Sequence, residues 1–153
     1  MVEAPGFLGF VVLGSDTQVG MSLCRYLQER HIPFDELSSC DLQNADALKG
    51  AVYNNEHRYV VNALFEELPA EATVDSQHWA AANSTVAKAC SDKKKVLLQL
   101  SSALVFSGQQ TRAYSESDDP EPSSALGKVY LALEQDAAEL CPQSVILRTS
   151  WLF

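Results

Sequence analysis

Short apolar runs alternate with helix-like segments along the whole chain, and this alternation constrains the fold more than any other feature. Segment 7–13 is almost continuously apolar and is closed by Gly14, which is typical of a strand buried on both faces of a sheet. The pattern predicts further strands at 34–37, 59–63, 96–100 and 144–148, and helices at 18–29, 44–53, 71–90 and 125–140. Strand followed by helix, repeated in this way, predicts an α/β fold with a doubly wound, Rossmann-like parallel sheet.

Size, charge and cysteine usage narrow the function classes. With 153 residues, of which 46% are hydrophobic, we predict one domain over 1–153 with a sizeable core. The 20 acidic and 11 basic residues give a net charge of −9, which disfavours nucleic acid and anionic membranes as partners. No apolar run approaches the roughly 20 residues of a membrane helix, and residues 1–6 lack the basic start of a signal peptide. Four separated cysteines without a CxxC pair predict reduced thiols, no metal site and a cytoplasmic protein.

The turn after the first predicted strand is the first candidate ligand site. It runs from Gly14 to Gly20, and ligands of doubly wound sheets bind at the carboxyl ends of the strands. Gly14 permits a tight turn, and Gly20 permits close packing of helix on strand. A dinucleotide site also favours glycine where this chain has Thr17, because backbone must approach the pyrophosphate there. Two readings stay open: a cofactor turn that includes Gln18 and Val19, or a plain helix entry with Thr17 as N-cap.

Other polar residues near predicted strand ends are weaker candidates. Asp35, Glu36 and Asp41 follow Gly14 by about the distance at which an acid would hold an adenosine ribose. Ser102 ends the fourth predicted strand, where a hydroxyl could polarise a substrate carbonyl or cap its own turn. The three histidines fall on predicted helix ends or surfaces, so no Ser-His-Asp arrangement is indicated.

Further motifs follow one another in a fixed order. They are Gly14 to Gly20, Val61-Asn62-Ala63, Asn83, segment 101–106, Glu116-Ser117-Asp118 with Pro122, and Arg148-Thr149-Ser150-Trp151. In this order and spacing they resemble the dTDP-4-dehydrorhamnose reductase family, within the extended short-chain dehydrogenase/reductases. The resemblance covers nearly the whole chain. It implies NAD or NADP as cofactor, a nucleotide-sugar as a further ligand, and cofactor contacts from Gly14, Thr17, Gln18, Val19, Gly20, Asp41, Asn62 and Ala63.

The resemblance fails at the residues that carry the family's chemistry. The family reduces a sugar-nucleotide ketone with a Tyr-x-x-x-Lys pair, in which Tyr supplies a proton and Lys supports that Tyr and the nicotinamide ribose. Here Leu126 occupies the Tyr position and Tyr130 occupies the Lys position. Lys128 points to another face of the helix, and the Tyr130 hydroxyl is one helical turn away from the family's acid. Ser102 is then a catalytic remnant, and we predict that the family reaction is impaired.

Three functional readings follow. The first is a reductase of the family, present in part or using an unusual acid. The second is a non-catalytic binding or regulatory subunit resembling the regulatory subunit of methionine adenosyltransferase, with a protein partner or a homo-oligomer. The third is a sugar-nucleotide epimerase or dehydratase, against which the same losses count. The family's C-terminal substrate-binding portion has no counterpart in 1–153, which predicts an open sheet edge or apolar patch after the fifth strand.

Overall fold

The computed structural model describes residues 9–39, 44–65, 68–69, 73 and 76–150. Its strands are β1 (Phe10–Leu13), β2 (Phe34–Leu37), β3 (Tyr59–Asn62), β4 (Val96–Ser102) and β5 (Val145–Thr149). Its helices are α1 (Gln18–Glu29), α2 (Ala45–Tyr53), α3 (Ser76–Asp92), the short 3-10 helix η3 (Ala103–Val105) and α4 (Ala125–Leu140). Every strand and helix predicted from the sequence is present. The bounds differ mainly at β4, which continues through Ser101 and Ser102, and at α3, which spans Ser76–Asp92 where the sequence predicted 71–90.

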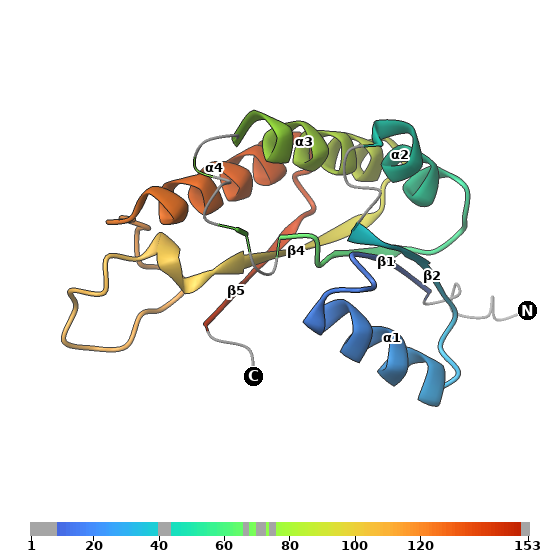
Figure 1. The fold of residues 1–153 in the computed structure, drawn as a ribbon, viewed down its shortest axis with the longest axis horizontal. Helices are drawn as coiled ribbons and strands as arrows, with labels where there is room; N and C mark the ends of the chain where they lie inside the picture. Colours follow the sequence, from blue (N-terminus) through green and yellow to red (C-terminus); the bar gives the residue numbers. More distant parts are fainter. Residues whose placement is uncertain (1–8, 40–43, 66–67, 70–72, 74–75, 151–153) are drawn as a thin grey trace, which may run out of the picture.

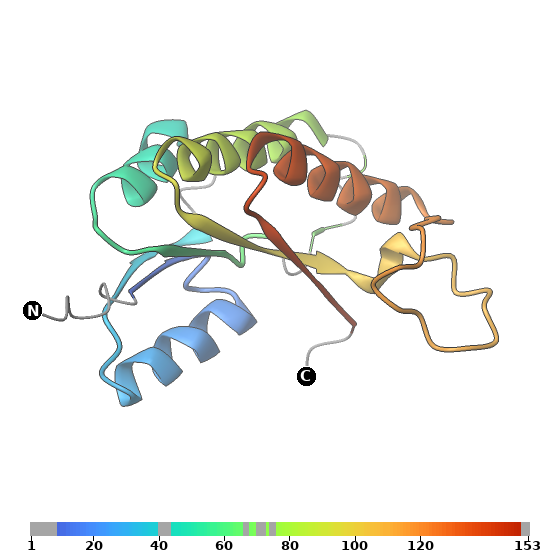
Figure 2. The ribbon, with the colours of Figure 1, turned by 180° about the vertical axis from the view of Figure 1, so that it is seen from behind.

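All strand pairs are parallel, in the order β2-β1-β3-β4-β5. Helix α1 covers one face of the sheet, and α2, α3 and α4 cover the other (Figures 1 and 2). This division follows from the right-handed crossover rule, because the chain reverses direction across the sheet after β2. The prediction of an α/β Rossmann-like domain is therefore confirmed.

The core has a large and a small part, one on each face. Val11, Leu13, Val60 and Leu97 belong to the large cluster, which joins the sheet to α2, α3 and α4. On the other face Val12 packs with Cys24 and Leu27 of α1. Alternate residues of β1 thus serve opposite clusters, as expected of a strand buried on both faces.

The end of the sheet at β5 is less covered. Ile146 packs against the large core cluster, whereas Val145 and Leu147 are 44% and 40% exposed. Successive side chains of a strand alternate between faces, so these two valine and leucine side chains lie on the face opposite α4. They are among the exposed large hydrophobic side chains of the described residues.

Candidate functional site

The turn between β1 and α1 requires glycine at both ends. Gly14 has φ +82°, and a Cβ atom there would lie 3.0 Å from the Ala63 carbonyl carbon and 3.0 Å from the Leu64 nitrogen. A Cβ on Gly20 would lie only 1.9 Å from the Gly14 carbonyl oxygen. The turn therefore brings the end of β1, the end of β3 and the first turn of α1 into direct backbone contact. This close approach is the glycine geometry predicted from the sequence.

Thr17 is the N-cap of α1, as one of the two sequence-based readings proposed. Its Oγ1 accepts a hydrogen bond from the Gly20 N–H at 3.2 Å and donates one to the Gly14 carbonyl at 2.8 Å. Gln18 and Val19 are the first two helical residues. The threonine hydroxyl thereby satisfies one of the first-turn N–H groups that a helix otherwise offers to an anion. The turn keeps its glycine geometry and gains an internal cap.

Asp16 ties this turn to the segment that follows β2. Its carboxylate accepts hydrogen bonds from the Ser39 N–H at 2.6 Å, the Ser39 hydroxyl at 2.7 Å and the Ser38 hydroxyl at 3.0 Å. Hydrogen bonding to Ser39 holds the pKa of Asp16 below its usual value, so the side chain stays ionised. Sequence reasoning missed this residue. The sequence did offer a signal, because Asp16 lies in the glycine turn at the carboxyl end of the first strand, beside which the carboxyl end of the second strand was expected.

Asp35 and Glu36 lie within β2 and not past its end. The Asp35 carboxylate is 3.5 Å from Nε2 of His57, on the side of the sheet that α2 covers. Glu36 points to the other face of the sheet, toward α1. Burial, and after it the nearby Glu36 carboxylate, raise the pKa of Cys24 in α1 to about 11. These directions argue against either acid as the ribose ligand. Asp41, the third candidate, lies outside the described residues.

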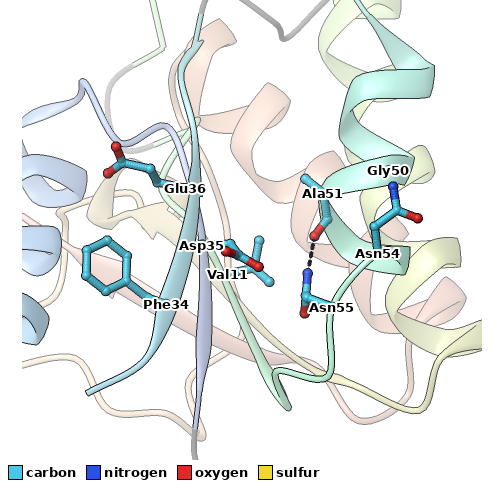
Figure 3. Close-up of a pocket in the computed structure, with 8 residues that line it drawn as sticks. All are labelled: Val11, Phe34, Asp35, Glu36, Gly50, Ala51, Asn54 and Asn55. Carbon is cyan, nitrogen blue, oxygen red and sulfur yellow. Dashed lines mark hydrogen bonds between the residues drawn. The ribbon is translucent and has the colours of Figure 1, made fainter. Parts of the chain in front are cut away.

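A groove lies beside the edge strand β2, and it is not at the strand carboxyl ends. Figure 3 shows Asp35 facing α2 across this groove, with Phe34 and Glu36 on the other side of the strand. The groove is about 550 Å³ in volume. Its lining residues are Val11, Phe34, Asp35, Glu36, Gly50, Ala51, Asn54 and Asn55. Asn54 and Asn55 follow α2 and precede the amino end of β3. The groove therefore lies toward the amino ends of the strands, whereas the Gly14 turn lies at their carboxyl ends.

The polar residues at the ends of β3 and β4 bond within the protein. Asn62 is fully buried, donates to Oε1 of Gln99 at 2.9 Å and accepts from the Leu64 N–H at 3.3 Å. Ala63, also buried, donates its N–H to the Leu13 carbonyl at 2.9 Å. Ser102 accepts from the Leu104 N–H at 3.2 Å and caps η3. The structure thus places Ser102 in the turn-capping role that the sequence left open.

On α4, Leu126 and Tyr130, the residues that the sequence motifs align with the family's catalytic pair, belong to the packed interior. Leu126 is partly buried against the large core cluster. Tyr130 is only 3% exposed, and its hydroxyl oxygen accepts a hydrogen bond from the Leu68 N–H at 2.8 Å. Lys128 is exposed, on a different side of the helix. The Tyr130 ring therefore fills the space between α4 and the segment after β3, where its hydroxyl satisfies a buried backbone donor.

A buried ion pair, also missed from the sequence, stands further along α4. Arg148 of β5 donates to both carboxylate oxygens of Glu134, with the shortest contact at 2.7 Å from Nη2 to Oε2. The Ser101 hydroxyl donates to Oε1 of the same carboxylate at 2.6 Å. The guanidinium of Arg148 also lies over the Phe106 ring, 4.9 Å from its centroid. This network joins β4, β5 and α4 behind the candidate site.

The long connection before α4 is irregular, as predicted, but it carries its own contacts. The Tyr114 ring stacks on Phe106 with centroids 4.2 Å apart, and its hydroxyl accepts from the Gly108 N–H at 2.9 Å. Arg112 pairs with Asp118, and this pairing is the largest cause of the lowered pKa of that carboxyl. The connection is thereby held against η3.

No three His, Cys, Asp or Glu side chains of the described residues converge in a way that could hold a metal ion. Among those same residues, no helix combines the length and apolarity that crossing a bilayer needs.

The five-stranded parallel sheet and the glycine turn at the carboxyl end of β1 define a Rossmann-like α/β domain. The chain belongs to the RmlD substrate binding domain family, whose model matches residues 9–153. The resemblance recognised in the sequence motifs is thus confirmed.

Curated relatives agree with this assignment. The dTDP-4-keto-6-deoxy-D-glucose reductase of Streptomyces niveus is 28% identical over 151 residues, covering 94% of this chain and 52% of the relative. The dTDP-4-dehydrorhamnose reductase of Escherichia coli K12 is 27% identical over 155 residues, covering 95% of this chain and 52% of the relative. The chain therefore spans about half the length of these curated relatives.

Solved structures show the same fold. A dTDP-4-dehydrorhamnose reductase from Clostridium acetobutylicum has a TM-score of 0.82 at 22% identity, over 95% of this chain and 54% of that one. The Bacillus anthracis enzyme, solved in complex with NADP, has the same TM-score, identity and coverage. MoeE5, solved with UDP-glucose and NAD, has a TM-score of 0.69 at 19% identity, over 93% of this chain and 52% of that one.

Proposed function

We propose that this chain is a dinucleotide-binding domain of its family that binds NAD or NADP but does not carry out the family's ketone reduction. The observation that carries the proposal is the burial of Tyr130, whose hydroxyl is bonded to the Leu68 N–H. A side chain in that role cannot replace the lysine that the family places at this position. The proposal includes a cytoplasmic location, which suits the free cysteines Cys24, Cys90 and Cys141.

The adenosine half of a dinucleotide fits the residues of the β1–α1 turn. Gly14 and Gly20 leave no room for side chains of their own, and their contacts produce the tight entry into α1 on which a pyrophosphate rests in this fold. Thr17 narrows the approach and occupies the Gly20 N–H. We therefore expect binding weaker than that of a three-glycine turn, with the contacts concentrated at Gly14, Gln18 and Val19.

The nicotinamide half does not meet the groups that its chemistry needs. A bound nicotinamide cofactor supplies hydride, and reduction of a ketone also needs a proton donor beside the carbonyl oxygen. Leu126 has no proton to give. Removal of one positioned proton donor costs a typical enzyme about 10²–10⁴-fold in rate. The loss of both residues of the pair supports a binding role without turnover.

Two measurements on the purified chain test this proposal. Calorimetric titration with NADH and NADPH is expected to give saturable binding to at least one of them. The Gly20→Ala variant should lose that binding because its new Cβ meets the Gly14 carbonyl, whereas Gly50→Ala, in α2 and outside the β1–α1 turn, should keep it. Absence of binding to both dinucleotides at millimolar concentration would overturn the binding half of the proposal.

The second measurement follows NADH or NADPH absorbance in the presence of a nucleotide-sugar ketone of the kind named in the curated relatives. We expect no consumption beyond the protein-free rate. Steady turnover that depends on protein concentration would instead support the reductase reading, with a proton donor other than residue 126.

A further inference from the structure

The placement of Asp16 bears on which dinucleotide the site accepts. In Rossmann-like folds the adenosine ribose lies between the glycine turn and the end of β2, where an acid reads its 2′-hydroxyl or an arginine holds a 2′-phosphate. Asp16 belongs to the turn, and its carboxylate reaches Ser38 and Ser39 directly after β2. It therefore bridges the two segments that flank this ribose.

The donors that could hold a phosphate here are already engaged by that carboxylate. The Ser39 N–H and both serine hydroxyls donate to Asp16. To bind these donors, the ribose 2′-phosphate of NADP would have to displace the ionised carboxylate of Asp16. It would then lie beside that negative charge. The described segments 14–20 and 37–39 also contain no Lys, Arg or His.

We propose that Asp16 makes this site selective for adenine dinucleotides with a free ribose 2′-hydroxyl, NAD(H), over the 2′-phosphorylated NADP(H). This inference rests on the proposed function, because it concerns the same turn. The physical cause is like-charge repulsion, since a 2′-phosphate carries a charge of about −1.5 to −2 near neutral pH. The lowered pKa of Asp16 keeps its carboxylate ionised over the pH range in which the 2′-phosphate is charged.

The test compares NADH and NADPH affinities for the wild-type chain and two charge-removing variants. For the wild-type chain we expect NADH to bind at least about ten-fold more tightly, the scale of one repulsive contact near a protein surface. Asp16→Asn should reduce that ratio several-fold, mainly by improving NADPH binding. Asp46→Asn removes the same charge from the exposed first turn of α2 and should leave the ratio unchanged.

A salt series on the wild-type chain makes the test independent of how Asp16→Asn folds. Because salt screens exposed charges, the NADH-to-NADPH affinity ratio should narrow as ionic strength rises from about 0.05 M to 0.5 M. Equal or tighter NADPH binding by the wild-type chain would overturn the selectivity and leave the proposed function standing. A ratio unaffected by both Asp16→Asn and salt would also overturn it. If neither dinucleotide binds, the proposed function fails, and the selectivity fails with it.

Discussion

The Tyr130→Phe substitution isolates the structural contribution of the Tyr130 hydroxyl, which the proposed function treats as part of the packed interior. It removes only the hydroxyl oxygen that accepts from the Leu68 N–H at 2.8 Å, and it leaves the buried ring in place. A buried backbone donor that loses its partner costs about 1–3 kcal/mol. For a domain of this size, 1 kcal/mol lowers Tm by roughly 2–4 °C. We therefore expect Tm to fall by several degrees.

Calorimetric or dye-based melting, with amide hydrogen exchange at Leu68, provides the assay. The Leu68 amide should exchange faster in Tyr130→Phe, because its acceptor is lost and the site becomes easier to open. Tyr114→Phe is the matched control. That hydroxyl also accepts a backbone N–H, from Gly108, but on the exposed connection, where water replaces it. Its Tm should match that of the wild-type chain.

The reasoning is refuted if Tyr130→Phe has the same Tm as the wild-type chain and its Leu68 amide exchanges no faster. The hydroxyl would then have no structural role, and a chemical role for Tyr130 would regain support.

Three further predictions concern packing, charge and reactivity. Gly20→Ala should destabilise the fold by about 3 kcal/mol, the upper end of overpacking costs, because its Cβ would lie 1.9 Å from the Gly14 carbonyl oxygen. Gly50→Ala, by contrast, should stabilise the fold by about 0.5–1 kcal/mol, because it replaces a glycine inside a helix. Glu134→Gln should lower the unfolding free energy in urea by about 1–3 kcal/mol, since it removes the charge that pairs with partly exposed Arg148. Burial raises the pKa of Cys90 to about 12, so this thiol should resist a disulfide reagent at mildly alkaline pH until the chain unfolds.

Each of these predictions has a clear contrary result. Gly20→Ala with wild-type stability would mean that the α1 entry is not tightly packed. An unchanged urea midpoint for Glu134→Gln would show that the ion pair contributes nothing beyond a neutral hydrogen bond. Rapid modification of Cys90 in the folded chain, located by peptide mass spectrometry, would contradict its burial.

The regular elements could be predicted because each has a local cause. The apolar run that ends at Gly14 gives β1, and the polar N-cap at Asn44 precedes α2, whose helical pattern is equally local. Even β2, with two acidic residues among four, followed from its position between two helical patterns. The prediction was least accurate at the end of β4 and at both ends of α3, where the apolar pattern does not mark the boundary.

The candidate site was less predictable because its contacts join residues far apart in sequence. Asp16 meets Ser39 across 23 positions, and Ser101 meets Glu134 across 33. No local pattern encodes such a pair. The prediction that residue 126 replaces the family's proton donor needed only the sequence, because a motif defines that position. The bond between Tyr130 and Leu68, 62 positions apart, required the fold.

The central claim is that the chain binds a dinucleotide through the β1–α1 turn and that α4 does not contact it. Hydrogen exchange by mass spectrometry, with and without saturating NADH, tests this claim most directly. The account predicts slower exchange in segments 14–20 and 37–39 on adding NADH, and unchanged exchange in segment 124–134. Protection of segment 124–134 would contradict it, because α4 would then contact the bound cofactor. A chain whose exchange does not change in any segment would contradict the binding claim itself.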